Sequence, residues 1–413
     1  MTAGPRATER DDSNLWRTLE PAVGRLKQRN ASALRHQIDI ARIAAPTGSE
    51  RARAQYVAHV LAERGWHDQR MDSVGNVIAQ WAPPHVNAML APVTCLAHLD
   101  TVFDADTPLD CIIDGDRISC PGISANGRGL TAMLSLARSL RHAEVESLLQ
   151  RPIELVATVG EEGEGNLRGA RHYFDRRAQH DLPPPYAVIV LDGPGDATIV
   201  HHAVGSHRLR IHLQGVGGHS WADYGTPNPI HALTAAAAAV ARLGTRTCPR
   251  ISVTVSRIQG GESLTSIPID AWCDIDLRAT NADALHAVAT EIHRIAHTAC
   301  RDESTRAPQS HPGRALRAGI TLLGARPCGS LDASHPLVQI AHSATRWQQR
   351  EPVSGSASTD ANIAISRGIP AIAIGGGGRG GAAHSRDEWY DNTDGMRGVA
   401  RALGILVAVA QQV

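Results

Sequence analysis

The feature that most constrains the fold is a series of short apolar segments that alternate with helix-forming segments. "VTCLAHLDTV" (93–102), "PIELVATVG" (152–160) and "YAVIVLDG" (186–193) are rich in β-forming residues. Helical spacing follows in "GRGLTAMLSLARSLRHA" (127–143) and "LRGARHYFDRRA" (167–178). Strands with continuous apolar runs are buried on both faces, and their alternation with helices favours parallel pairing. The sequence therefore predicts an α/β fold whose sheet has parallel character.

A second pattern begins at Ser206 and interrupts this alternation. Three segments alternate apolar and polar residues and two have helical spacing, in the order β-α-β-β-α: 207–217, 229–244, 251–261, 271–280 and 281–299. This order is typical of a small, separate α/β unit. We therefore expect a larger domain made of residues 1–205 and 320–413, with a smaller domain, residues 206–319, inserted into it.

The composition excludes several classes of protein. The chain has 41 basic and 41 acidic residues, so no overall field favours nucleic acid or an anionic membrane. Lys27 is the only lysine, which excludes a phosphate-binding G-x-x-x-x-G-K-[ST] loop and argues against a Schiff-base lysine. Residues 1–16 lack a signal peptide's apolar core, and no apolar run approaches the ~20 residues that span a bilayer. We expect a cytoplasmic protein without nucleic-acid or membrane partners.

Acidic residues and histidines stand where the predicted strands end. They are His98 and Asp100 in "HLD", Glu161 and Glu162 in "GEEG", Asp192 in "LDG", and His384 after the glycine run "GGGGRGG". Metal-dependent hydrolysis needs imidazole and carboxylate ligands, together with a free base beside the metal-bound water. A histidine with an aspartate two positions on suits a ligand and the group that orients it. Each residue alone is more often structural, but their order and positions together indicate a metal-hydrolase site.

These motifs in this order resemble the zinc aminoacylase/carboxypeptidase superfamily, which includes peptidase T, carboxypeptidase G and succinyl-diaminopimelate desuccinylase. The shared segments, between about residue 35 and residue 413, are "HLDTVF", "PGI…RGL", "GEEGEGNLRGAR", "LDG", "GGHS", "GGES…SIP", "DLR", "STDAN" and "GIPAIAIGGGGRGGAAHSRDEWYD". The resemblance implies a zinc-exopeptidase-like catalytic domain with a central mixed sheet. It also implies that the inserted α/β domain is a lid and dimerisation domain, and that the protein is a homodimer.

The resemblance implies a role for each strand-end residue. The metal ligands would be His98 and Asp192 for one ion, and Glu162 and His384 for the other. Asp100 would orient His98, and Glu161 would be the general base that deprotonates the attacking water.

Three residues of the inserted domain match substrate-contacting positions of the same superfamily. His219 in "GGHS" matches a histidine that crosses a dimer interface to stabilise the oxyanion. Arg278 in "DLR" matches an arginine that binds a substrate carboxylate, a task that suits a bidentate guanidinium. Thr265 stands where an asparagine often assists that arginine. The substrate implied is small and amino-acid-like, with a free carboxylate.

One position departs from the superfamily pattern. Its bridging aspartate, in a D-D-x-x-G stretch, falls on Ala125 when "PGISANGRGL" is aligned on Gly122 and Gly129, and the next aspartate falls on Asn126. Two dications ~3.5–4 Å apart repel by on the order of 20 kcal/mol at an effective dielectric constant of about 20, and a shared carboxylate offsets much of this. Without that carboxylate each ion would have two protein ligands instead of the usual three. We expect at most one ion, zinc or another divalent metal, or none.

The sequence leaves three functions open. The first is an amidohydrolase or peptidase that cleaves the amide bond of a small dipeptide or N-acyl amino acid, with a one-metal site and Glu161 as base. The second is a metal-independent homologue that uses the same pocket for non-hydrolytic acid–base or acyl-transfer chemistry in a specialised biosynthetic pathway. The third is a non-catalytic binding dimer.

Overall fold

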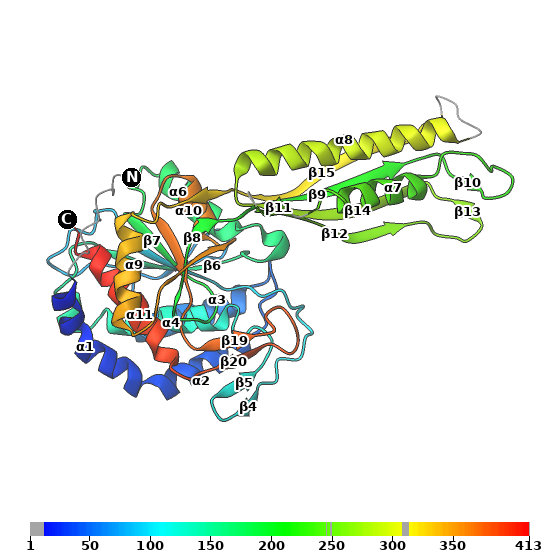
Figure 1. Ribbon diagram of the computed structural model, residues 1–413. Coiled ribbons are helices and arrows are strands. Elements are labelled where there is room, and N and C mark those ends of the chain that lie inside the picture. The colour runs from blue at the N-terminus through cyan, green and yellow to red at the C-terminus, as the bar shows by residue number, and fades with distance from the viewer. Residues whose placement is uncertain (1–11, 245, 248–249, 308–313, 413) are drawn as a thin grey trace, which may run out of the picture. The chain divides into compact units, whose positions relative to one another are not determined.

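The computed structural model describes residues 12–244, 246–247, 250–307 and 314–412, and the chain forms two compact units (Figure 1). The boundaries between the units lie after Ala203 and after Gly329. Unit 1 contains both ends of the chain, and unit 2 is the segment between the boundaries.

Unit 1 is built on a nine-stranded sheet. Eight strands lie in the order β1 (Arg70–Met71), β2 (Val77–Trp81), β6 (Ile153–Thr158), β3 (Val93–His98), β7 (Ala187–Leu191), β18 (Ala371–Ile374), β8 (Thr198–Ala203) and β16 (Gly329–Ser330), and β17 (Val353–Ala357) pairs with β8. The four central strands β6, β3, β7 and β18 run parallel. The pairs β1–β2, β2–β6 and β8–β18 are antiparallel. The predicted α/β fold with a central mixed sheet is confirmed.

Both faces of this sheet are covered by helices, as the apolar runs predict. Alternate residues of β3 enter different hydrophobic clusters: Val93, Cys95 and Ala97 join one, and Leu96 joins the other. The first cluster includes α1 (Ser13–Gln28), α3 (Arg51–Glu63), α4 (Gly127–Ser139), α5 (Ala143–Glu146), α9 (Pro336–Trp347) and α11 (Gly395–Ala410), and the second includes α6 (Arg168–Gln179) and α10 (Ala361–Ser366). Each fully buried leucine or isoleucine contributes about 2 kcal/mol to this packing.

A small antiparallel sheet lies beside α2 (Asn30–Ala41). Its strands follow the order β19 (Arg379–Gly381), β20 (Trp389–Asp391), β5 (Arg117–Ser119) and β4 (Ile112–Asp114). Tyr390 and Ile118 are register partners, both fully buried, and they pack with Ile123 and with Ile38 of α2. This pairing brings the segment after β5 next to the segment before β20, which are far apart in the sequence.

The N-terminal part of unit 1 forms two helices where the spacing of apolar residues alone predicts one. Spacing favours one helix over residues 14–45, but α1 ends at Gln28 and α2 begins at Asn30. Arg29 leaves the helical region, with φ −96° and ψ 7°, and its N–H donates to the carbonyls of Arg25 and Leu26. Asparagine favours helix ends because its side chain competes for backbone hydrogen bonds. The break places the Arg29 side chain at the junction of the two helices.

Unit 2 is a five-stranded antiparallel sheet covered by two helices. The strands lie in the order β11 (Arg246–Thr247), β12 (Arg250–Gly260), β14 (Asp270–Ala279), β9 (Gly205–Gln214) and β15 (Arg317–Arg326). Helix α7 (Pro229–Ala241) starts where the Asn228 side chain accepts the N–H of Ile230, and α8 (Ala282–Arg306) starts at the same kind of cap, Asn281. Both helices pack on the apolar side of the sheet, which forms a hydrophobic core of its own.

A two-stranded ladder of β10 (Gly218–His219) and β13 (Ser266–Ile267) completes unit 2. Among the described residues, none of the helices combines the length and apolar character that a bilayer-spanning segment needs.

Candidate active site

Four of the predicted site residues meet because their strands are parallel neighbours. His98 ends β3, Glu161 and Glu162 follow β6, and Asp192 follows β7. The carboxyl ends of parallel strands lie at one edge of a sheet, which is where such folds place their ligands. The glycine-rich segment after β18 leads to His384, whose Nε2 lies 2.8 Å from Glu162 Oε1. The structure therefore brings all five side chains to one place.

His98 is held in the orientation that a metal ligand requires. Its Nδ1 lies 3.0 Å from the carbonyl oxygen of Asp100 and 3.5 Å from Asp100 Oδ1. These contacts favour a proton on Nδ1 and leave Nε2 to face Asp192, whose Oδ1 is 3.9 Å away. His98 is 3% exposed, so the geometry is also protected from solvent.

Asp100 positions both His98 and the turn that carries Glu161 and Glu162. Its two carboxylate oxygens accept the backbone N–H groups of Glu161 and Glu162, each at 2.9 Å, and Oδ2 also accepts the Thr47 hydroxyl at 2.8 Å. Burial alone would raise the pKa of Asp100, but the hydrogen bonds from His98, Glu162 and Thr47 hold it well below its usual range. Asp100 is therefore an ionised group whose acceptor sites are all used for positioning.

The electrostatic surroundings of His98 favour a cation. Burial lowers the pKa of His98, but the hydrogen bond to Asp100 and the carboxylates of Glu161 and Asp192 outweigh burial and raise that pKa well above its ordinary value. The negative potential that favours a proton on this imidazole equally favours a divalent ion beside it.

Glu162 and His384 form the other half of the site. Burial raises the pKa of Glu162. The hydrogen bond with His384 and the nearby His98 outweigh burial and lower this pKa below its ordinary value, so the carboxylate is ionised. The same hydrogen bond raises the pKa of His384. The His384 side chain is 51% exposed, and its backbone has a positive φ of 66° in the loop that follows the glycine run.

The donor atoms present fit one divalent ion. One donor atom each from His98, Glu161 and Glu162 lie within 4.8 Å of one another, and all three residues are buried. Three protein donors is the number typical of a catalytic zinc site. Asp192 lies within 4 Å of His98, and His384 lies within 4 Å of Glu162. These four residues could therefore hold an ion without the carboxylate of Glu161 as a ligand.

The loop that carries Ala125 is firmly anchored, although the alanine side chain has no atom that could bind a metal. The buried carboxylate of Glu388 accepts four hydrogen bonds from it, from the N–H groups of Gly122 (3.1 Å), Ser124 (2.8 Å) and Ala125 (2.8 Å) and from the Ser124 hydroxyl (2.6 Å). The peptide bond between Ala125 and Asn126 is cis.

Asn126 ties the same loop to the strand that precedes Asp192. Its Nδ2 donates to the carbonyl of Leu191 at 2.9 Å, and its Oδ1 accepts the N–H groups of Gly129 and Gly193, each at 3.0 Å. The first of these Oδ1 contacts caps α4. Position 125 is therefore held beside the metal-ligand candidates.

Glu388→Gln is expected to lower the free energy of unfolding by about 1–3 kcal/mol, since an amide nitrogen cannot accept the N–H of Gly122 and leaves a buried donor unpaired. Urea unfolding followed by circular dichroism measures this loss. The matched control is Asp387→Asn at the exposed neighbouring position, where we expect a change below about 0.5 kcal/mol. Equal effects of the two substitutions would contradict the anchoring role.

Three residues near the site had no assigned role in the sequence: Asp360, Thr47 and Glu388. Asp360, in "STDAN", is 1% exposed and accepts the hydroxyl of Thr158, the last residue of β6, at 2.5 Å. Burial and the negative charges of Asp100 and Asp192 raise the pKa of Asp360 to about 6. The motif around Asp360 was recognisable in the sequence, whereas Thr47 and Glu388 act through contacts that no local pattern indicates.

The three predicted substrate residues of unit 2 occupy two different places. His219 on β10 and Thr265 beside β13 are neighbours, because Ser220 N–H donates to the Thr265 carbonyl at 2.9 Å. Arg278 lies opposite Ser206 of β9, near the end of β14. Asp270, at the start of β14 and on the side of Thr265 in the sequence, is eight residues away from Arg278, or ~26 Å at ~3.3 Å per residue. Arg278 donates to Asp276 at 2.7 Å. Within one chain the structure does not bring Arg278 to Thr265.

Comparison with known proteins yields a family and a set of similar folds. The family model described as "Peptidase family M20/M25/M40" matches residues 95–410. A tripeptidase from Staphylococcus aureus is 17% identical with a TM-score of 0.73, covering 93% of this chain and 99% of its own. The di-peptidase Dug1p from Saccharomyces cerevisiae is 12% identical with a TM-score of 0.73, covering 97% and 99%. YxeP from Bacillus subtilis, described as a dinuclear metal binding peptidase, is 15% identical with a TM-score of 0.67, covering 94% and 100%.

Proposed function

Because the chain belongs to the peptidase family M20/M25/M40, a family of hydrolytic enzymes, we propose that it cleaves the amide bond of a small dipeptide or N-acyl amino acid with one divalent ion and Glu161 as general base. The observation that carries this proposal is the convergence of His98, Glu161 and Glu162, with donor atoms within 4.8 Å of one another, at one sheet edge. The di-peptidase and tripeptidase descriptions of similar structures support the substrate class.

His98 and Glu162, with Asp192 and His384 beside them, would hold the ion, zinc or another divalent metal. Bound there, the ion would polarise the substrate carbonyl and lower the pKa of a water molecule. The dinuclear character of YxeP is not carried over, because Ala125 has no group that could bridge two ions.

Glu161 would move the proton of the reaction. It is 4% exposed, and its backbone N–H is fixed on Asp100 at 2.9 Å. In the proposed hydrolysis Glu161 takes a proton from the attacking water and returns it to the leaving nitrogen as the C–N bond breaks. The products are a carboxylic acid and an amine, so protons and charge balance.

We propose in addition that the inserted domain acts as lid and dimerisation domain in a homodimer. Trp221 is 87% exposed, Tyr224 73% and Leu264 103%, all close in sequence to His219 or Thr265. An exposed apolar group of this size is typical of a surface covered by another protein. His219 and Thr265 would then complete the active site of the partner subunit, where that subunit's own arginine at position 278 would bind the substrate carboxylate.

A second candidate is metal-independent acid–base chemistry in the same pocket, favoured by the alanine at the bridging position. Glu161, Glu162 and Asp360, a buried carboxyl whose pKa is about 6, would supply the proton-transfer groups. A non-catalytic binding dimer would use the pocket without turnover.

Chelation, together with two supporting measurements, separates these three functions. Chelation is expected to lower the rate of amine release from dipeptides and N-acyl amino acids at least about 100-fold, and Zn²⁺ or Mn²⁺ is expected to restore it. Elemental analysis of the active protein should find no more than one ion per chain. Activity that survives chelation would favour the metal-independent function. A melting temperature raised by these compounds without any turnover would favour the binding dimer.

A further inference from the structure

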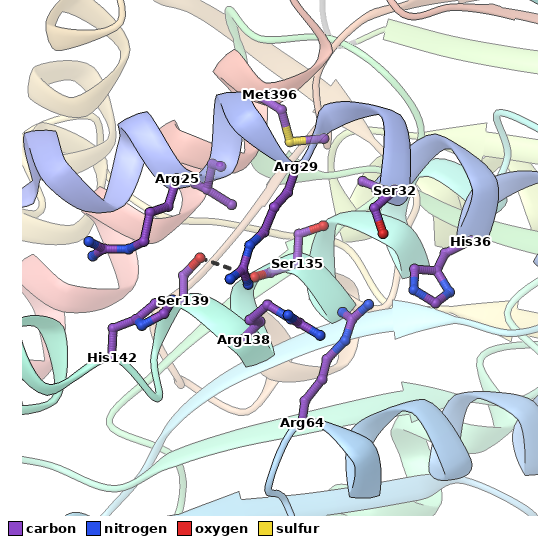
Figure 2. A pocket seen from close by; sticks show the side chains of 12 residues that line it. Arg25, Arg29, Ser32, His36, Arg64, Ser135, Arg138, Ser139, His142 and Met396 are labelled. Atoms are coloured by element: carbon purple, nitrogen blue, oxygen red, sulfur yellow. Dashed lines mark hydrogen bonds between the residues drawn. The ribbon is translucent and has the colours of Figure 1, made fainter.

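A cationic pocket lies in unit 1 (Figure 2). It has a volume of about 100 Å³. Its ionisable lining residues are Arg25, Arg29, Arg64, Arg138, His36 and His142. No acidic side chain of the described residues lines it, although the chain as a whole is neutral.

The charged groups come from elements that the fold packs together. Arg25 is on α1, Arg29 is at the break between α1 and α2, and Arg64 follows α3. Arg138 is in the last turn of α4. Figure 2 shows Arg29, Arg64 and Arg138 directed into the same space. The convergence therefore depends on tertiary packing and is not a feature of one helix surface.

The positive charge of the pocket is only partly neutralised within the described structure. Arg25 forms an ion pair with Glu144, and the Arg64 guanidinium donates to the carbonyl of Leu134. For Arg29 and Arg138, no ion pair with an acidic side chain of the described residues is present.

The titration behaviour of these groups agrees with mutual repulsion. Burial, followed by the charges of Arg138 and Arg25, lowers the pKa of Arg29. Burial and then Arg138 lower the pKa of Arg64 to about 10. Burial and the three arginines Arg25, Arg29 and Arg138 lower the pKa of His142. Each group meets an environment that a bound anion would relieve.

We propose that this pocket binds a small phosphate-type anion, either inorganic phosphate or the phosphate group of a small monoester. Guanidinium groups bind phosphate oxygens through paired hydrogen bonds, and several of them suit a dianion. The volume of about 100 Å³ has room for a group of this size.

The pocket is a separate site from the catalytic one. Helix α4 connects the two regions: Asn126 caps its first turn beside Asp192, and Arg138 stands twelve residues later, ~18 Å away at 1.5 Å per residue. An anion bound at Arg138 therefore does not occupy the space between His98 and Glu162.

Thermal unfolding and calorimetry of the full chain test this proposal. Sodium phosphate is expected to raise the melting temperature by at least about 2 °C over sodium chloride at the same ionic strength. Methyl phosphate, titrated in parallel, distinguishes the two sources of the anion by which of them binds more tightly. The Arg29→Gln/Arg138→Gln double variant should lose this shift, and without phosphate it should melt no lower than the wild type, because repulsion is relieved.

Controls keep the result specific to the pocket. Arg17→Gln, at an exposed position of the same helix α1, should retain the full phosphate shift. His98→Ala should retain it as well, since the catalytic site is separate. Arg138→Gln alone, at an exposed side chain, should weaken phosphate binding at least about fivefold. The proposal is overturned if phosphate has no effect beyond chloride, if the double variant keeps the shift, or if His98→Ala removes it.

Discussion

Glu161→Gln is expected to lower kcat about 1000-fold while leaving KM close to that of the wild type. A glutamine is nearly the same size and keeps the backbone hydrogen bond to Asp100, but it cannot accept a proton from water. A general base acts in the transition state rather than in substrate binding, so the loss should fall on kcat. Steady-state amine release under metal-saturating conditions measures the effect.

The matched control is Glu164→Gln, an exposed position in the same turn, which should leave kcat within about twofold of the wild type. Metal content must be measured in both variants, because Glu161 is also a possible metal ligand together with His98 and Glu162. Retention of more than a tenth of kcat would contradict the base role. Loss of the ion together with activity would make Glu161 a ligand instead.

Ala125→Asp is expected to raise the number of bound divalent ions from at most one to two per chain. Position 125 is held beside Asp192 by the bonds of Asn126 to Leu191 and Gly193. A carboxylate there would give each ion a third protein ligand and offset much of a repulsion on the order of 20 kcal/mol. Zinc titration by calorimetry, with elemental analysis of the purified variant, measures the stoichiometry.

Ala125→Asn is the control, because it has the size of aspartate without its charge and should leave the stoichiometry unchanged. Two tightly bound ions in the wild type would show that the bridging carboxylate is dispensable. A variant with aspartate at position 125 that still binds one ion would show that the loop does not direct this side chain to the metal donors.

The larger part of the fold could be predicted because it depends on local patterns. Apolar runs with a polar residue at the end indicated the parallel strands, and the neighbouring ends of β3, β6 and β7 then brought His98, Glu161 and Asp192 together. The split of the first helix at Arg29 was not predicted, because the spacing of apolar residues continues across the break.

The supporting contacts could not be predicted because they join distant parts of the chain. Glu388 anchors Ser124 across 264 residues, and Asp360 meets Thr158 across 202. The cationic pocket was hidden for a related reason: a net charge of zero says nothing about where tertiary packing gathers charges of one sign. Residue type and order indicated the chemistry, but the geometry that supports it is a property of the folded chain.

The anchoring of the Ala125 loop by Glu388 also bears on how such an enzyme diversifies. The hydrogen bonds that shape the loop use backbone groups and the Ser124 hydroxyl, and none of them involves the side chain at position 125. The substitution proposed to change the metal stoichiometry therefore leaves the hydrogen bonds that shape the loop in place. If the proposed one-ion site is correct, a relative with a bridging carboxylate could share this loop and its hydrogen bonds, and differ from the present chain in one side chain.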